Sequence, residues 1–381
     1  MIRIRTLDNL RIPRGARVFY RVDYNVPLEG TRITDTTRID ETLPTIRRLR
    51  EAGAALVLAS HLGRPKGERK EKYSLEPVRE QLAATLGTDV KWADDCVGAE
   101  TSSLKAGELL LVENLRFHAG EEKNDADFAK ELRKLADVYV NDAFGACHRA
   151  HASIDALPRL FPREATAGGL LLERELEFLQ KVTSAAARPF VALLGGAKIA
   201  GKIEPLEALV NLADTVLIGG GMANTFLAAR GVEMGGSLVD NDSIDVAKRI
   251  GDKVVLPVDL VVGDEIAIVD ADKGLAPGQK AFDIGPRTIA VFDAALKNAR
   301  MVFWNGPMGV FEKEPFAKGT MAMARAVAEA DAITVVGGGE SVEAVKASGY
   351  AGRITHISTG GGASLEFISG AALPGVEVLR I

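Results

Sequence analysis

Basic side chains recur in the first half of the chain, close to the ends of short apolar runs. Arginine carries a planar pair of N–H donors that matches carboxylate and phosphate oxygens, and histidine adds further donors. A single surface arginine is usually only solvated, but repeated placement after apolar runs indicates a shared site for a small anion carrying both groups. The group comprises Arg21, Arg38, His61, Arg64, Arg116, His148, Arg149 and His151. Asp23 and Asn25 stand beside it and can accept hydrogen bonds from substrate hydroxyls.

Arg38, His148 and His151 bear on which ligand the basic group could bind. Arg38 lies in the first turn of an expected helix (TDTTRIDETL), where the helix dipole disfavours a cation unless that cation faces an anion. His148 and His151 have a spacing that a metal could use. No cysteine pattern or third carboxylate ligand accompanies them, so a zinc site is not predicted there.

Glycine dominates the corresponding positions in the second half. The triplets 219–221, 337–339 and 360–362 each follow an apolar run and precede a helical pattern. One tight turn needs glycine anyway, but three triplets indicate backbone left bare for close approach to a ligand. Helix-start N–H groups at such turns suit phosphates. No triplet fits G-x-G-x-x-G with an acidic residue about 20 positions further on, so a nicotinamide cofactor is not favoured.

Two lysines follow another glycine pair. The segment 196–203 (GAKIAGKI) matches G-x-x-x-x-G-K, but Ile203 stands where a P-loop has the Ser or Thr that ligates Mg²⁺, which argues against a P-loop. Lys198 and Lys202 are four residues apart and are expected on one face of a helix start. They either meet phosphates there or lie exposed on a covering helix.

Two doubly wound parallel sheets of an α/β protein are expected to position these residues, because β-branched runs alternate with helical patterns throughout. Ligands of such sheets bind at the carboxyl ends of the strands. The strand ends carry basic residues in one half of the chain and glycines in the other. This difference favours two domains with the site between them. The expected strands are 18–22, 55–59, 109–112, 138–141, 190–194, 215–218, 254–257, 301–304, 332–336 and 355–357.

Two helices are expected from apolar spacing. Ile39, Leu43, Ile46 and Leu49 fall on one helical face. The stretch 168–182 (GGLLLERELEFLQKV) lies between the two sets of strands and is interpreted as a hinge helix that links the domains. The alternative is an ordinary covering helix within one large sheet.

The totals agree with a two-domain cytoplasmic protein. The 381 residues are enough for two domains, and a net charge of −5 gives no reason to expect nucleic acid or an anionic membrane as partner. Two cysteines, Cys96 and Cys147, are too few for a disulfide framework and suit a reducing compartment. The amino-terminal segment lacks the apolar core of a secretory signal, and no apolar run approaches the ~20 residues that span a bilayer.

Taken together, these segments resemble phosphoglycerate kinase. The matching motifs occur in the order found in that family and cover about residues 17 to 378. They are RVDYNVP (21–27), SHLGRP (60–65), ENLRF (113–117), NDAFGACHRAHAS (141–153), LGGAKIAGKI (194–203), GGGMANTFL (219–227), NGPMGVFE (305–312), GGGES (337–341) and STGGGASLE (358–366).

The resemblance implies that a first domain, residues 1–167, binds 3-phosphoglycerate or 1,3-bisphosphoglycerate. The interdomain helix would span 168–182, and the tail 365–381 would pack back on the first domain. The chain would act as a cytoplasmic monomer in glycolysis, with small-molecule substrates. The matching substrate positions are Asp23, Tyr24, Asn25, Arg38, His61, Leu62, Gly63, Arg64, Arg116 and Arg149.

The resemblance further implies that residues 183–364 bind ATP or ADP with Mg²⁺. Lys202 would contact phosphates, Gly219 would border the adenine, and Glu312 would bind the ribose. Glu340 stands where the family usually has an Asp that ligates Mg²⁺, and Ser341 replaces the usual Thr. The matching nucleotide positions are Lys198, Lys202, Gly219, Asn305, Glu312, Gly338, Gly339, Glu340 and Ser341.

In phosphoryl transfer, positioning and charge stabilisation carry the reaction. Arg38 and Lys198 are assigned to the equatorial oxygens of the transferred group, and the turns at Gly338 and Gly361 to backbone N–H donors. The domains would have to close about the hinge helix. Two alternatives remain: a two-lobed anion-binding protein that closes on its ligand, and a different acyl-phosphate kinase.

Overall fold

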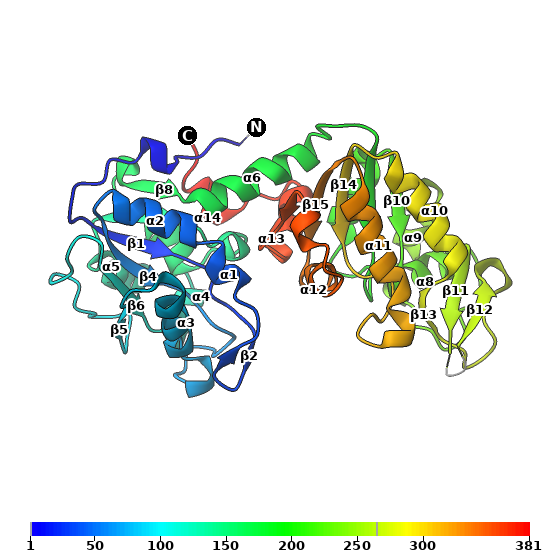
Figure 1. Cartoon of the computed structure of the whole chain (residues 1–381), viewed down its shortest axis with the longest axis horizontal. Coiled ribbons are helices and arrows are strands. Elements are labelled where there is room, and N and C mark those ends of the chain that lie inside the picture. Colours follow the sequence, from blue (N-terminus) through cyan, green and yellow to red (C-terminus); the bar gives the residue numbers. More distant parts are fainter. Residues whose placement is uncertain (1, 264–265) are drawn as a thin grey trace. The chain divides into compact units, whose positions relative to one another are not determined.

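A computed structural model describes residues 2–263 and 266–381 of the chain, which divides into two compact units (Figure 1). The first unit holds the residues up to Glu177 together with Ala372–Ile381, and the second holds Phe178–Ala371. The division falls inside helix α6 (Leu170–Thr183), the segment expected to link two domains.

The first unit is built on a six-stranded parallel sheet. The central strands have almost no exposed residues, as expected of a parallel sheet covered on both faces. Strands β5 and β8 at the two edges were not expected from the sequence. In sheet order the strands are β5 (Lys91–Ala93), β6 (Leu109–Val112), β4 (Ala55–Ala59), β1 (Arg17–Arg21), β7 (Val138–Asn141) and β8 (Thr166–Gly168).

The expected apolar helix face before β4 is buried, but two helices share it. α1 (Thr37–Asp40) ends before α2 (Leu43–Glu51) begins, and Pro44 stands in the first turn of α2, where its missing N–H costs nothing. Ile39 and Ile46 pack in one core with residues of β1 and β4 and of α3 (Glu76–Leu86). A second group of helices in this unit contact one another: α4 (Ala119–Glu122), α5 (Ala126–Arg133) and the π-helix η5 (Ala152–Ala156).

The carboxyl terminus belongs to the first unit. Helix α14 (Pro374–Glu377) packs against η5, and the N–H of Gly375 donates to the carbonyl of Cys147 over 3.0 Å. The return begins at Ala372 rather than at residue 365, because helix α13 (Gly362–Ile368) packs against helix α7 (Ile203–Leu212) of the second unit.

The second unit contains a five-stranded parallel sheet of order β10-β9-β14-β15-β16. Its strand order reverses between β9 and β14, which makes the loops after these two strands the expected ligand position. The run at 254–257 is not a strand, and only an isolated bridge joins Val255 to Leu217. The strands are β9 (Phe190–Leu194), β10 (Thr215–Ile218), β14 (Met301–Asn305), β15 (Ile333–Gly337) and β16 (His356–Ile357).

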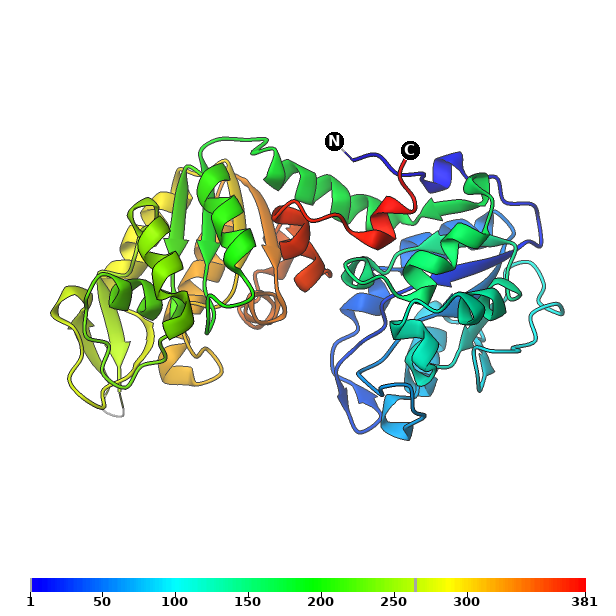
Figure 2. The same cartoon turned by 180° about the vertical axis from the view of Figure 1, so that it is seen from behind.

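Helices cover both faces of this sheet (Figure 2). One contacting group is α7 (Ile203–Leu212), α8 (Gly220–Ala229) and α9 (Ile244–Ile250), and the other is α10 (Pro286–Lys297), α11 (Lys318–Glu329) and α12 (Gly339–Ala347). Among the helices of the described residues, none combines the length and apolar character needed to cross a bilayer.

A small antiparallel sheet in the second unit was not expected from the sequence. β11 (Asp259–Val262) pairs with β12 (Ala267–Asp270) and β13 (Ala281–Ile284). These strands are four residues long, and β12 exposes most of its side chains, so the sequence carries little apolar periodicity there. The hairpin of β2 (Leu28–Glu29) and β3 (Arg32–Ile33) in the first unit was missed for the same reason.

Candidate active site

Asp23 is the centre of the polar cluster at the carboxyl end of β1. Its Oδ2 lies 2.7 Å from a guanidinium nitrogen of Arg38, and its Oδ1 accepts the backbone N–H of Asn25 at 3.2 Å. Arg38 remains 30% exposed, so it can also reach a ligand. The cation in the first helical turn therefore faces an anion, as the sequence indicated.

The charges around Asp23 determine its ionisation. Burial of the carboxyl opposes ionisation, but the positive charge of Arg38 and the other charges nearby outweigh it and hold the pKa of Asp23 at about 2. Asp23 is thus a carboxylate at neutral pH and offers a fixed acceptor beside two arginines.

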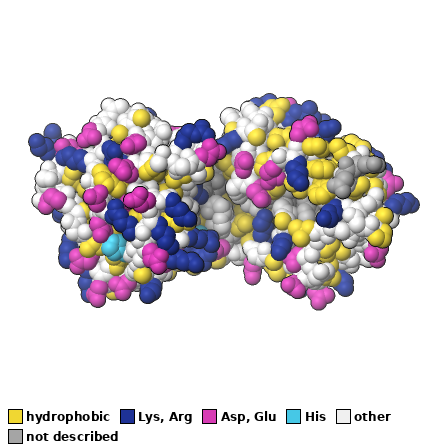
Figure 3. All heavy atoms as spheres, turned by 90° about the horizontal axis from the view of Figure 1, so that it is seen from below, with side chains coloured by type: hydrophobic (Ala, Val, Ile, Leu, Met, Phe, Trp, Pro, Cys, Tyr) yellow, Lys and Arg dark blue, Asp and Glu magenta, His cyan; other side chains and the backbone are white. Residues whose placement is uncertain are grey.

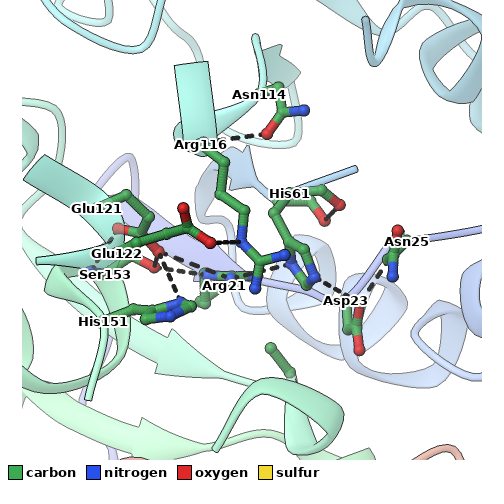
Figure 4. Close-up of polar contacts among 12 residues, drawn as sticks. Arg21, Asp23, Asn25, His61, Asn114, Arg116, Glu121, Glu122, His151 and Ser153 are labelled. Carbon is green, nitrogen blue, oxygen red and sulfur yellow. Dashed lines mark hydrogen bonds and ion pairs between the residues drawn. The ribbon is translucent and has the colours of Figure 1, made fainter. Parts of the chain in front are cut away.

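Arg21 has a different role from the one expected of the basic group. It is fully buried and donates to Ser153 Oγ over 2.7 Å and to the carbonyl of Val22, while its guanidinium lies 3.9 Å from the carboxylate of Glu121 (Figure 4). Glu121, also fully buried, accepts the hydroxyl and the backbone N–H of Ser153. Arg21 therefore holds neighbouring segments together in the interior and does not present its charge to a ligand.

The contact between Arg21 and His61 orients the imidazole. A guanidinium nitrogen of Arg21 lies 3.3 Å from Nδ1 of His61, and because arginine can only donate, Nδ1 must accept. Burial lowers the pKa of His61 well below its usual value. The charge of Asp23 opposes this shift and the surrounding arginines add to it, so the ring is neutral. Its proton then resides on Nε2, which points toward Asp23 Oδ1 at 3.8 Å.

The loops after β4 and β6 are joined to this cluster by side chain to backbone hydrogen bonds. Asn25 Oδ1 accepts the N–H of Gly63 at 2.8 Å, and Arg116 donates to the carbonyl of Gly63 at 2.9 Å. Gly63 has φ of +62°, and a Cβ there would meet the ring of Tyr73 at 2.3 Å, so only glycine fits. Burial lowers the pKa of Arg116, and Arg21 lowers it further.

The remaining expected substrate residues differ in accessibility. Arg64 and Arg149 are exposed, and Figure 3 shows Lys and Arg side chains gathered over the first unit. Tyr24 and Leu62 are buried, and the phenol of Tyr24 lies 2.8 Å from the hydroxyl of Thr42. These two side chains therefore belong to the core, and only their backbone can face a ligand.

The glycines after β9 and β14 allow two loops of the second unit to touch. The N–H of Gly196 donates to the carbonyl of Pro307 at 2.9 Å, and a Cβ on Gly306 would lie 2.2 Å from the carbonyl of Gly195. A Cβ on Gly219 would lie 2.4 Å from the sulfur of Met308. These glycines are thus required by the contact between loops.

The prediction that Lys198 and Lys202 lie on one face of a helix start is wrong. Residues 195–202 form a loop, α7 begins only at Ile203, and the nonhelical Lys202 precedes it, because Gly201 adopts φ of +77°. Lys198 is exposed. Lys202 is half-buried, its amine donates to the carbonyl of Gly195 at 3.3 Å, and burial lowers its pKa against the opposing charge of Glu340.

A cleft of about 660 Å³ lies beside these loops, within the size range of small-molecule sites. Glycine backbone forms one wall, and Pro257, Leu260 and Ile284 supply apolar surface suited to a flat ring. Glu312 and Glu340 both line it and are exposed. Neighbouring Gly220 and Gly221, rather than Gly219 itself, reach the cleft.

The turn after β15 places donors at the start of α12. Gly338 has φ of +90°, and a Cβ there would lie 2.7 Å from Nδ2 of Asn305, an atom without a hydrogen-bond acceptor among the described residues. Ser341 is buried and accepts the N–H of Gly306. Gly339 and Glu340 begin α12, while Gly361 precedes α13 with φ of +50°.

Comparison with known proteins agrees with this geometry. The profile of the family described as phosphoglycerate kinase matches residues 7–371. The chain belongs to the phosphoglycerate kinase family. It is 53% identical to the phosphoglycerate kinase of Moorella thermoacetica, with 98% of each chain covered, and 48% identical to that of Geobacter metallireducens, with 99% and 98% covered. The solved phosphoglycerate kinase from Coxiella burnetii superposes with a TM-score of 0.88 at 36% identity, with 99% of each chain covered.

Family membership makes the chain a kinase of glycolysis and confirms the activity and the fold class expected from the sequence. The sequence alone did not identify the buried residues that hold the side chains of the site in position. Glu121 belongs to none of the quoted motifs, and Ser153 ends the motif 141–153 without a role assigned to it. Their burial beside Arg21 identifies both. Asp283 lines the cleft with a pKa that burial raises to about 7, and nothing in its sequence neighbourhood indicates this.

The low pKa of Asp23 predicts an acid-dependent contribution to stability. Because the folded-state value of about 2 lies below the ordinary 3.8, the contribution is present above pH 4 and is lost as the pH falls through 2. Its size is about 2 kcal/mol. Urea unfolding of the Asp23→Asn variant should therefore differ less from wild type at pH 2.5 than at pH 5. In an Arg38→Ala background this convergence should weaken, and equal convergence in both backgrounds would contradict the assignment.

Proposed function

We propose that the chain transfers a phosphoryl group reversibly between 1,3-bisphosphoglycerate and ADP, giving 3-phosphoglycerate and ATP, with the glycerate substrate on the first unit and the nucleotide on the second. The cluster of Asp23, Arg38, His61 and Arg116 at the strand ends of the first unit carries this proposal. It combines cations for phosphate and carboxylate oxygens with acceptors for a hydroxyl.

A coupled assay with 3-phosphoglycerate and ATP tests the proposed reaction. We expect ADP formation that depends on both substrates. Activity with another small carboxylate, and none with 3-phosphoglycerate, would instead identify a different acyl-phosphate kinase. Binding of 3-phosphoglycerate without turnover would support a two-lobed binding protein.

In this proposal the side chains of the first unit position the substrate. Arg116, which Gly63 holds in place, and the exposed Arg64 and Arg149 bind its anionic groups. Asp23 and Asn25 accept from its hydroxyl. The Nε2–H of His61 donates to one of its oxygens.

The transfer itself needs charge rather than a base, because the attacking phosphate or carboxylate oxygen is already ionised. We assign Arg38 and Lys198 to the equatorial oxygens of the group in flight. Backbone N–H groups at the Gly338 and Gly361 turns stabilise the same charge.

The cleft of the second unit is proposed to take the nucleotide, with the base on its apolar wall and Glu312 at the ribose hydroxyls. We assign Lys202 and Asn305 to the nucleotide phosphates. The Glu340 carboxylate lines the same cleft at the first turn of α12, and a hard oxygen ligand there fits Mg²⁺, which favours one or two carboxylates plus phosphates. When bound, the ion neutralises charge on the nucleotide phosphates.

We further propose that the enzyme works as a cytoplasmic monomer. Both cysteines are free and buried, in keeping with a reducing compartment, and membership of a glycolytic family supports the location. Gel filtration with light scattering at micromolar concentration measures the molar mass, and we expect the mass of a single chain.

Substitution of Arg38 should separate transfer from binding. We expect Arg38→Ala to fold normally and to lose most of its kcat, by about a hundredfold or more, with a modest change in KM, because its charge matters most in the transition state. Lys198→Ala should behave alike, whereas Lys202→Ala should mainly raise the KM for nucleotide. Arg47→Ala, an exposed arginine of α2, is the control. A large KM increase at unchanged kcat would show that Arg38 only binds substrate.

Domain closure is the second expectation, since substrate and nucleotide residues lie in different units and α6 contributes residues to both. Closure would also exclude water that hydrolyses the acyl phosphate. Solution scattering should give a smaller radius of gyration with both substrates than with either one. An unchanged radius in the ternary complex would eliminate α6 as a hinge.

Glu340 should set the Mg²⁺ requirement. Glu340→Asp keeps the charge and should stay active, with at most a shifted requirement. Glu340→Gln keeps the shape without the charge and should raise the Mg²⁺ concentration for half-maximal rate by about tenfold or more. The alternative is that Glu340 only stabilises the start of α12 through the helix dipole. Wild-type Mg²⁺ dependence in the Gln variant, at fixed ATP, would establish that alternative.

A further inference from the structure

Three side chains with metal-binding atoms meet in the first unit, apart from the residues assigned to substrate. Asp95 and Cys96 lie in the loop after β5, and His118 lies between η3 (Leu115–Phe117) and α4. One ligand atom from each lies within 4.8 Å of the others. A thiolate, an imidazole and a carboxylate are the ligand types that Zn²⁺ prefers.

The cluster is built by specific contacts. Nε2 of His118 lies 2.7 Å from Oδ1 of Asp95, and the His118 ring stacks on Phe128 with centroids 5.1 Å apart, which fixes the ring plane. Asp95 Oδ1 also accepts the backbone N–H of Val97 at 3.0 Å. Cys96 is only 1% exposed and forms the floor of the cluster, whereas Asp95 is exposed and His118 is partly exposed, so an ion can enter from their side.

The charge around the thiol favours a cation. The carboxylate of Asp95 lies beside the Cys96 thiol, with its ligand atom within 4.8 Å of the sulfur. A divalent ion at this position would compensate that carboxylate and the thiolate that it creates.

We propose that Cys96, His118 and Asp95 form a binding site for a zinc-class divalent cation, with a water in the fourth position. Binding releases the Sγ proton of Cys96 to solvent. The ring proton of neutral His118, which Nε2 donates to Asp95 in the metal-free site, moves to Nδ1 by exchange with solvent, so that Nε2 can bind the ion. Two ligand atoms on one tetrahedral zinc lie about 3.3 Å apart, so Asp95 and His118 separate slightly and exchange their hydrogen bond for bonds to the ion.

The site would join a separate loop to a segment that the substrate cluster uses. The loop at 94–97 would be tied to the segment that begins with Arg116 and continues to Glu121, the partner of Arg21 and Ser153. The ion would thus stabilise the first unit without contacting the phosphoryl group.

Titration of the metal-free full chain with Zn²⁺, in competition with a chromophoric chelator, tests the proposal. We expect one equivalent to bind, and Co²⁺ in its place to give the near-ultraviolet thiolate-to-metal absorption band. Cys96→Ser and His118→Ala should each weaken Zn²⁺ binding by about a hundredfold or more, since even residues that only support a ligand contribute 10- to 100-fold. Cys147→Ser, which removes the other buried thiol, is the matched control and should bind as wild type.

Two results would overturn the site: a Co²⁺ complex without the thiolate band, or unchanged Zn²⁺ affinity in His118→Ala. Retained kinase activity shows that a variant is folded. If Cys96→Ser folds poorly, His118→Ala still tests the site, because His118 is partly exposed. Zn²⁺ should also raise the melting temperature of wild type and Cys147→Ser but not of His118→Ala, and an equal rise in all three would place the ion elsewhere.

Discussion

The first unit is organised by the need to compensate one buried cation. Arg21 has no exposed surface, and an unpaired charge there would be strongly destabilising. Its partners come from α4, η5 and the loop after β4, so these segments converge on the carboxyl end of β1. The same bonds fix the His61 tautomer. Arg38, by contrast, keeps part of its side chain exposed while it pairs with Asp23.

In the proposed function, the second unit binds the nucleotide phosphates by the opposite means. Its loops after β9 and β14 approach so closely that a methyl group at Gly306 would collide with the backbone of the facing loop. Side chains are excluded there, and backbone N–H groups with the dipoles of following helices provide the positive potential. The two units therefore combine charged side chains with bare backbone, as suits a reaction governed by positioning and electrostatics.

Most parallel strands and the basic positions could be predicted from sequence, because buried strands are continuous apolar runs and strand ends are ligand positions. The antiparallel sheet could not, since β12 is mostly exposed and lacks the alternation of a half-buried strand. The buried role of Arg21 depends on Glu121 and Ser153, which contact it only after folding. The Lys202 loop was mistaken for a helix because helix-compatible residues surround Gly201, whose left-handed backbone delays the start of α7.

The return of the carboxyl terminus has a consequence for synthesis on the ribosome. The second unit is one continuous stretch, Phe178–Ala371, whereas the first unit includes the last ten residues, Ala372–Ile381. Residues Gly375 and Arg380 bond to Cys147 and Ile4, so these contacts cannot form until residues 372–381 have been synthesised and have left the exit tunnel. Domains generally fold in the order of their synthesis. Here the unit that is translated first is the last to be completed, and a nascent chain that ends before residue 372 cannot assemble the full first unit.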